Sequence, residues 1–196
     1  MYQVIGAARS RTLRVLWMLE ELGLDYEHIP ARPHSPDVTE ENPAGKIPVL
    51  IEGDATLTDS TAIIQYLADK HGALTYPAGT IDRARQDGMT QLLLDEFDAA
   101  LWVAVRHMHL LPEALRQDGI ANTVGWEISR SAERLAHRID GQPFVMGDEM
   151  TVPDIILTHC GGWAMSGGFR NEVKVLRDYL RRMRNRPAYR RALARA

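Results

Sequence analysis

The sequence predicts a small α/β domain followed by an all-helical domain. Short strand-like runs alternate with helical segments over residues 1–77, whereas residues 85–196 show apolar side chains at helical spacing and no convincing strand. A segment at 78–84, which includes Gly79, separates the two patterns and is expected to be a linker. We therefore expect two domains joined at this point.

The elements of the first domain follow from periodicity and from the residues that end each run. Gly23 and Gly72 are expected to end the two helices, and the turn between the last two strands is centred on Gly53. In order, we expect a strand at 1–5, a helix at 11–22, a strand at 25–30, a loop at 31–45, strands at 47–51 and 55–57, and a helix after Asp59 and Ser60.

The second domain begins with an unusually long helix. Its apolar stripe has steps of four, four, four, three and four residues, which indicates a helix of about 25–30 residues; it consists of Met89, Leu93, Phe97, Leu101, Ala104 and Met108. A second helix is expected at about 113–140. Thr151, Pro153 and Asp154 form the start of a helix. The helix that follows is expected to be interrupted at Gly161-Gly162 and at Gly167-Gly168. Further helices are expected at 172–185 and from Pro187.

Composition limits the possible functions. The chain of 196 residues is 45% hydrophobic and 25% charged, which excludes intrinsic disorder. Its net charge of -3 gives no global reason to expect nucleic acid, and we expect neither a nucleic-acid nor a membrane partner. The start of the chain lacks a secretory signal, so we expect a cytoplasmic protein. Cys160 is the single cysteine and no histidine motif is present, so we expect no metal.

Three short segments carry groups suited to holding a ligand. Pro48 interrupts an apolar strand; it is either an edge-strand proline or a cis proline that leaves the backbone of Ile47 open to an extended peptide. Asp59 and Ser60 precede a helix; either they only cap it, or they bind a carboxylate and an ammonium group. Ser10 stands before the first helix and is either a cap or a hydrogen-bond donor to a ligand anion.

Together these segments resemble the cytosolic glutathione S-transferase superfamily, of bacterial and serine type, over essentially the whole chain. The capping box at 151–154 also resembles the family's pattern in its helical domain. The other matching segments are Ser10–Trp17, Glu20–Leu24, Asn42–Leu50 and Leu57–Leu67.

The resemblance implies a thioredoxin-like N-terminal domain, an all-helical C-terminal domain and a homodimer. It implies that Pro48 is cis, that the backbone of Ile47 pairs with the cysteinyl part of glutathione, and that Lys46 contacts the glutathione backbone or its glycyl carboxylate. Asp59 and Ser60 would hold the γ-glutamyl group. Most members have Glu or Gln where this chain has Asp59, which keeps the charge of Glu but is one methylene shorter.

The resemblance also implies a catalytic residue. Serine-type members place a serine four or five residues before the arginine that is Arg14 here. This implies Ser10 as the residue that stabilises the glutathione thiolate. Thr12 is the local alternative, and Arg9 and Arg11 are possible cationic neighbours of the thiolate.

The implied function is a detoxifying transfer of glutathione, the cosubstrate, to a hydrophobic electrophile without a metal. The electrophile pocket is expected between the domains, near the middle of the long helix, with Trp102 and Arg106 as candidate contacts. Alternatives are another glutathione-dependent reaction, such as isomerisation or dehalogenation, and a non-enzymatic binding or stress protein. The segment from Arg170 onward holds ten Lys+Arg and two Asp+Glu; we interpret it as a solvated helix face rather than a nucleic-acid patch.

Overall fold

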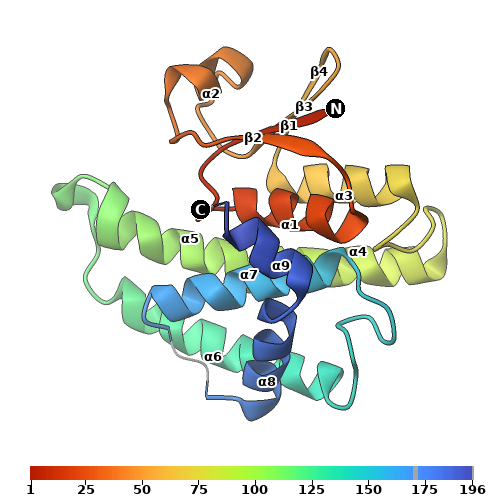
Figure 1. Ribbon diagram of the computed structural model, residues 1–196. Helices are drawn as coiled ribbons and strands as arrows, with labels where there is room; N and C mark the ends of the chain where they lie inside the picture. Colours follow the sequence, from red (N-terminus) through yellow and green to blue (C-terminus); the bar gives the residue numbers. More distant parts are fainter. Residues whose placement is uncertain (170–171, 196) are drawn as a thin grey trace. The chain divides into compact units, whose positions relative to one another are not determined.

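The computed structural model describes residues 1–169 and 172–195 (Figure 1). They form two compact units. Unit 1 consists of Met1–Ala78 together with the C-terminal segment from Arg184, and unit 2 consists of Gly79–Met183. Unit 1 is an α/β unit and unit 2 is helical, which is the predicted fold class. The sequence pattern places the C-terminal segment in the helical domain, whereas in the structure it is part of unit 1.

Unit 1 is built on one four-stranded sheet with the order β2-β1-β3-β4. The central strand β1 runs parallel to β2 and antiparallel to β3, and β4 closes the β3 hairpin. The strand bounds are Tyr2–Ile5 for β1, Tyr26–Ile29 for β2, Val49–Glu52 for β3 and Ala55–Thr58 for β4.

Both faces of this sheet are covered. Helices α1 (Thr12–Leu22) and α3 (Ser60–His71) pack together on one face, and α2 (Pro36–Glu41) lies on the other (Figure 1). Because successive strand residues point to opposite faces, Val4 is buried toward one side, while Ile5 joins Val49 and Val38 of α2 on the other.

The α2 helix corrects the expectation of a continuous loop at 31–45. Pro36 occupies the first helical turn, where its missing N–H is harmless, and Ser35 precedes it in extended conformation. Val38 is the only buried residue of this six-residue helix. One apolar residue produces no periodicity, so a helix at this position leaves no helical pattern in the sequence.

The C-terminal helix α9 packs against α1. In α9 (Pro187–Leu193), the Tyr189 ring meets Trp17 edge-on, with ring centroids 5.0 Å apart. Just before α9, Arg186 donates two hydrogen bonds to the Glu21 carboxylate, at 2.6 and 2.8 Å. These contacts hold the helix whose first turn follows Ser10.

Unit 2 begins with the long helix that the sequence predicts. It is a continuous helical run of α4 (Ile81–Leu93), η1 (Leu94–Ala99), α5 (Ala100–Val105) and η2 (Arg106–Leu110), in which η1 and η2 are π-helical. Helix α4 therefore begins inside the segment expected as a linker, with the Thr80 hydroxyl capping its first turn.

The π-helical turns agree with the spacing of the apolar stripe. Most of its steps are four residues, more than the 3.6 residues of an α-helical turn, and the wider π turns absorb the excess. The first five stripe residues are buried, as predicted. The sixth stripe residue, Met108, is 37% exposed; it lies in η2, which contains no buried residue.

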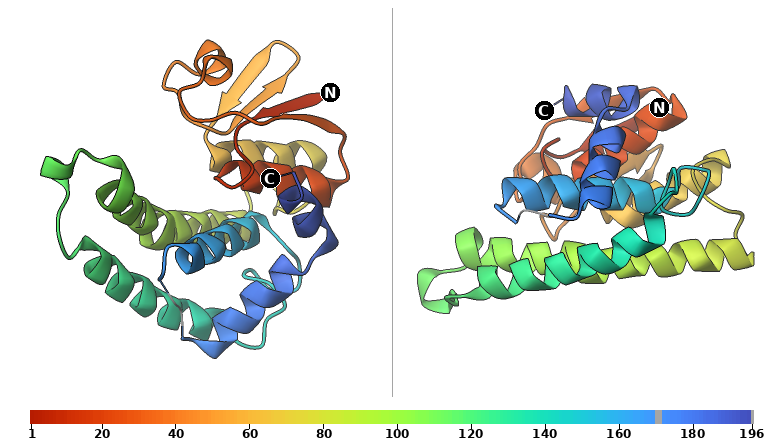
Figure 2. Two further views of the ribbon diagram at one scale, coloured as in Figure 1. Left: turned by 60° about the vertical axis from the view of Figure 1, so that its left-hand side comes forward. Right: turned by 90° about the horizontal axis from the view of Figure 1, so that it is seen from below.

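Three further helices complete unit 2. In Figure 2 the long run and α6 (Ile120–Ile139) lie side by side, with α7 (Val152–Ser166) against them. Helix α6 starts at Ile120 rather than near 113, because Gly119 adopts a left-handed φ of 85° after a short 3₁₀ turn at Glu113–Leu115. Helix α8 spans Lys174–Arg184.

Helix α7 has the predicted capping box at its start but is not interrupted at Gly161-Gly162. It continues through Gly161-Gly162, because a Cβ at Gly161 would lie 2.5 Å from a methyl carbon of Leu180; glycine permits close packing on α8 here. The capping box is present: the buried Asp154 carboxylate accepts from the Thr151 amide at 2.7 Å. Burial raises the pKa of the Asp154 carboxyl.

Part of the basic C-terminal charge is neutralised locally. Lys174 and Arg181 both pair with Asp178, at 2.5 and 2.9 Å, on the exposed side of α8. Arg170, also part of this basic segment, lies outside the described residues. Across the described ranges, no helix combines the length and apolar character needed to cross a lipid bilayer.

Candidate functional site

The predicted glutathione-site residues all belong to unit 1 and cluster at three places in its chain: the turn after β1, the segment before β3, and the start of α3. One place precedes a strand, and the other two stand at the start of a helix. Helix N-termini present unpaired backbone N–H groups and a partial positive charge, so two of the three favour anionic groups of a ligand.

Ser10 lies in the turn between β1 and α1 and is partly buried. Its Oγ donates to the Ala7 carbonyl oxygen at 2.7 Å and accepts from the Thr12 amide at 3.1 Å. Ser10 therefore accepts from the first residue of α1, although the N-cap position itself is Arg11. Since the Ser10 hydroxyl carries one proton, rotation away from Ala7 is required before it can donate to a ligand.

Thr12, the local alternative, has a different environment. Its side chain is fully buried, and its Oγ1 lies 2.9 Å from the Ser10 Oγ. Gly6 permits this tight turn, because it has a φ of 146° and a Cβ there would lie 2.3 Å from the Thr12 Oγ1. Thr12 thus supports Ser10 from the interior, and Ser10 is the hydroxyl closer to solvent.

The segment before β3 presents backbone rather than side chains. The Ile47–Pro48 peptide bond is cis. The Ile47 side chain packs against the apolar cluster that contains Ile5 and Val49, which fixes the residue at the end of the strand. Lys46 is exposed, and the Asn42 side-chain amide donates to its carbonyl oxygen at 2.9 Å.

Asp59 and Ser60 occupy the start of α3. Asp59 is the N-cap, and one of its carboxylate oxygens accepts from the Thr61 and Ala62 amides at 2.8 and 3.0 Å. Its φ of 69° is one that aspartate and asparagine adopt more readily than most residues. The carboxylate is exposed, so capping leaves it accessible to a ligand cation.

Ser60 is buried and is supported by Arg14, a contact that sequence reasoning missed. The Arg14 Nη1 donates to the Ser60 Oγ at 3.3 Å, and Arg14 itself is 1% exposed. An arginine inside the apolar run from Leu13 to Leu19 was the available signal. Because the Ser60 oxygen accepts from Arg14, its own proton can be donated to a carboxylate, and the arginine adds positive charge behind it.

The predicted electrophile contacts lie on the long helical run of unit 2. Trp102 of α5 is 37% exposed, and Arg106, the first residue of η2, is partly buried one turn later. Neither of them lines a separate cavity of about 430 Å³ in this unit. That cavity is bounded by Met108, Ala121, Asn122, Gly125, Ile128, Ser129, Gly167, Gly168 and Phe169.

Comparison with known proteins places this geometry in a family. Residues 5–75 match the family described as "Glutathione S-transferase, N-terminal domain". Glutathione S-transferase 3 of Zea mays is 30% identical over 165 residues, which cover 72% of this chain and 68% of that protein. The chain belongs to the glutathione S-transferase family.

Two further comparisons extend over most of this glutathione S-transferase. Glutathione S-transferase 2 of Anopheles gambiae is 29% identical over 185 residues, which cover 91% of this chain and 84% of that one. The theta class glutathione S-transferase from the citrus canker pathogen Xanthomonas axonopodis pv. citri, solved with glutathione bound, has the same fold. Its TM-score is 0.80 at 26% identity, with 100% of this chain and 98% of that chain covered.

Proposed function

We propose that this glutathione S-transferase binds glutathione in unit 1 and transfers its thiolate to a hydrophobic electrophile. In this proposal Ser60 and the start of α3 hold the γ-glutamyl carboxylate, and Asp59 holds the ammonium group. The backbone of Ile47 pairs with the cysteinyl residue, Lys46 faces the glycyl carboxylate, and Ser10 donates to the sulfur. The observation that supports it most is the buried hydrogen bond between Arg14 and Ser60 at the N-terminus of α3.

The chemical task of the site is to ionise the thiol. A thiol with a pKa near ~8.5 is only a few per cent thiolate at neutral pH. Lowering that pKa by about two units requires roughly 2.7 kcal/mol of preferential stabilisation of the anion. One hydrogen bond from Ser10 to the charged sulfur contributes about 1.5–3 kcal/mol, which is most of the requirement. The positive end of α1 acts in the same direction.

The transfer step then needs little more than positioning. The thiol proton leaves to solvent, the thiolate electron pair forms a bond to the electrophilic carbon, and the leaving group departs with the electron pair of the broken bond. For an aryl halide, the products are the thioether and a halide ion. We propose Trp102 and Arg106 of unit 2 as contacts to the electrophile, the indole for an apolar ring and the guanidinium for developing negative charge.

Two measurements test this function in sequence. Retention on immobilised glutathione with release by free glutathione tests binding, and failure to be retained contradicts the proposal at its first step. Turnover of a generic aryl halide is then compared between wild type and Ser10→Ala at neutral pH. We expect kcat/KM to fall about 10- to 150-fold, the equivalent of one hydrogen bond to a charged group.

Ser35→Ala is a matched control for that substitution. Ser35 also lies in a loop of unit 1 and precedes a helix, and its side chain makes no capping hydrogen bond. We expect its turnover to equal that of wild type. The loss in Ser10→Ala should diminish at alkaline pH, where the thiol ionises without assistance. A loss that does not vary with pH contradicts the assigned role of Ser10.

A further inference from the structure

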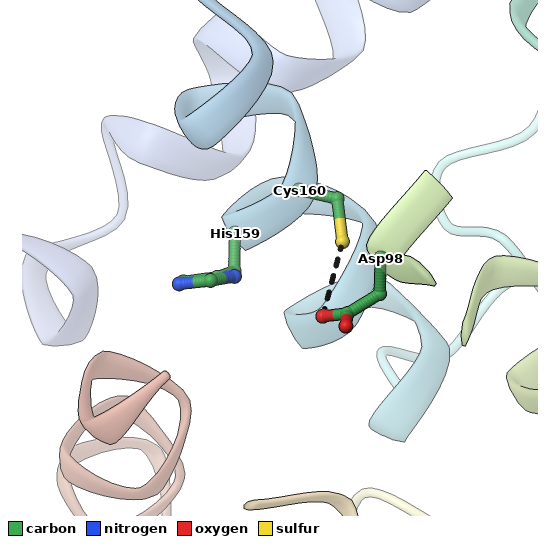
Figure 3. A group of neighbouring side chains, drawn as sticks. All are labelled: Asp98, His159 and Cys160. Atoms are coloured by element: carbon green, nitrogen blue, oxygen red, sulfur yellow. Dashed lines mark hydrogen bonds between the residues drawn. The ribbon is translucent and has the colours of Figure 1, made fainter. Parts of the chain in front are cut away.

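Unit 2 contains a buried group of side chains that the proposed reaction does not use. Asp98 and His159 are each 8% exposed and Cys160 is 1% exposed. Figure 3 shows Asp98 projecting from the long helical run toward α7, which carries the other two residues. One potential ligand atom from each of the three lies within 4.8 Å of the others. The Cys160 Sγ and the Asp98 Oδ2 are 4.0 Å apart.

The group follows a buried, mostly apolar stretch of α7. The residues of α7 just before it, including Ile155, Ile156 and Leu157, are buried hydrocarbon side chains. Placing a carboxylate, an imidazole and a thiol together in such a region is unfavourable unless they are paired or coordinate a metal. Cys160 donates a hydrogen bond to Asp98, and all three side chains are common metal ligands, so a cation bound between them can take the place of that pairing.

The backbone of the long helix contributes to this convergence. Asp98 lies in η1, a π-helical stretch, and both it and its neighbour Phe97 are buried. The wider turn of a π-helix lets two successive residues face the interior, whereas Asp95 in the same stretch is exposed. Such π-helical turns occur frequently at functional sites.

We propose that Asp98, His159 and Cys160 form a binding site for a thiophilic divalent transition metal, with Zn²⁺ as the expected ion. Thiolate, imidazole and carboxylate are the three ligand types of protein zinc sites, and three protein ligands leave a fourth position for water. Mg²⁺ and Ca²⁺ select all-oxygen sites and do not suit this donor set.

Asp98 and Cys160 need only a small adjustment, whereas the His159 ring points away from them in Figure 3 and has to turn toward the ion. Bond lengths of about 2.0–2.3 Å to Zn²⁺ place tetrahedral ligand atoms about 3.3–3.8 Å apart. The 4.0 Å separation of the Cys160 Sγ and the Asp98 Oδ2 is close to this, and the His159 nitrogen lies within 4.8 Å of both. Coordination forms a bond from sulfur to the metal and releases the thiol proton to solvent.

The bound ion would link η1 to α7 inside unit 2. The three residues come from two segments, with Cys160 separated from Asp98 by 62 positions, and no spacing motif joins them. For this reason the sequence alone predicts no metal. The site shares no residue with the proposed glutathione site, so either can be present without the other.

Cobalt provides the direct test, because Co²⁺ occupies zinc sites and absorbs light. Chelator-treated full-length protein, kept reduced, is titrated with Co²⁺ under anaerobic conditions. We expect saturation at one Co²⁺ per chain and a thiolate-to-cobalt charge-transfer band that Zn²⁺ abolishes by displacement. Absence of a saturable charge-transfer band in the wild-type protein overturns the proposal.

Matched substitutions identify the ligands. Asp98→Asn and His159→Gln should weaken metal binding more than about 10-fold, and Cys160→Ser should remove the charge-transfer band. The controls Asp95→Asn, in the same π-helical stretch, and His137→Gln, an exposed histidine of α6, should bind as wild type does. Equal binding by the ligand variants and their controls overturns the assignment.

A second measurement needs no variant, in case a buried substitution prevents folding. X-ray absorption of the zinc-loaded wild-type protein should show one sulfur and the remaining ligands as nitrogen or oxygen at the distances given above. A first shell of nitrogen and oxygen alone overturns the proposal, because Cys160 is the only cysteine of the chain.

Discussion

Replacing Ser60 by alanine should weaken glutathione binding about 10- to 150-fold while leaving the affinity for cysteinylglycine unchanged. Cysteinylglycine keeps the thiol and the glycyl carboxylate but lacks the γ-glutamyl residue that Ser60 is proposed to hold. The Ser60 Oγ is buried and accepts from Arg14 at 3.3 Å, so its proton is available to the carboxylate. A hydrogen bond to a charged group contributes about 1.5–3 kcal/mol, and each 1.4 kcal/mol is tenfold in Kd.

The substitution also affects the protein without ligand. Removing the Ser60 oxygen takes one acceptor from the buried Arg14, at a cost of about 1–3 kcal/mol of stability. For a chain of this size, each kcal/mol lowers Tm by roughly 2–4 °C. Affinity is therefore measured well below the lowered Tm, after circular dichroism has shown the variant to be folded.

Isothermal titration calorimetry with both peptides separates recognition from general damage. Thr61→Ala is the control on the same turn, because only the backbone of Thr61 bonds to Asp59. Asp59→Asn adds a second check: asparagine caps helices as well as aspartate does, so α3 is kept and only the charge is lost. We expect it to weaken glutathione binding about tenfold. Equal losses for glutathione and cysteinylglycine in Ser60→Ala, or no loss for either, would refute the proposed recognition.

The remaining predictions concern stability. Gly161→Ala should destabilise the protein by about 1–2 kcal/mol, because its Cβ would lie 2.5 Å from a leucine of α8; Gly162→Ala, with open space around it, should stabilise it by up to about 1 kcal/mol. Denaturant unfolding measures both, and equal effects would contradict the packing argument. Glu21→Ala removes the acceptor of both Arg186 hydrogen bonds and should lower Tm by several degrees in a thermal scan. An unchanged Tm would contradict the role of these bonds in holding α9 against α1. Hydrogen bonds from Ser131 and, to a smaller extent, Arg134 lower the pKa of Glu96. The ionised carboxylate therefore stabilises the fold above pH ~4.5, and this contribution is lost as the pH falls. The stability difference between wild type and Glu96→Gln should accordingly shrink in acid, and a difference that is constant from pH 7 to pH 3 would contradict this assignment.

The strands and most helices of this chain could be predicted from sequence because their signals are local. The runs of β1 and β3 are short and contain β-branched residues, and Gly23 and Gly72 end α1 and α3 with left-handed φ angles. The capping box before α7 is likewise a pattern of four adjacent residues. Where a signal lies within one turn or one strand, residue types suffice to locate the element.

The features that were missed depend on partners distant in sequence. Gly161 was expected to interrupt a helix, because its reason, the close approach of Leu180, is a tertiary contact. The helix that the sequence predicts from Pro187 is present as α9, but its place in unit 1 depends on the packing of Tyr189 on Trp17, near the other end of the chain. Sequence periodicity cannot identify such partners.

In the candidate site too, residues with local signals could be predicted and residues that depend on distant partners could not. Its residues at 10, 47, 59 and 60 could be singled out from local motifs, since each lies just before or at the start of a helix or strand. Arg14 could not be assigned a role, because its function depends on Ser60, 46 positions later. The convergence of Asp98 with Cys160 was equally invisible, because the π-helical turn that directs the aspartate inward leaves only a slightly long apolar spacing in the sequence.

The most direct test is a pH titration of glutathione bound to the wild-type protein, followed by the ultraviolet absorbance of its thiolate. A midpoint about two pH units below that of free glutathione is predicted, with Ser10→Ala returning most of the way to the free value. A bound thiol that titrates as it does in solution would contradict the account, whatever the affinity for the peptide.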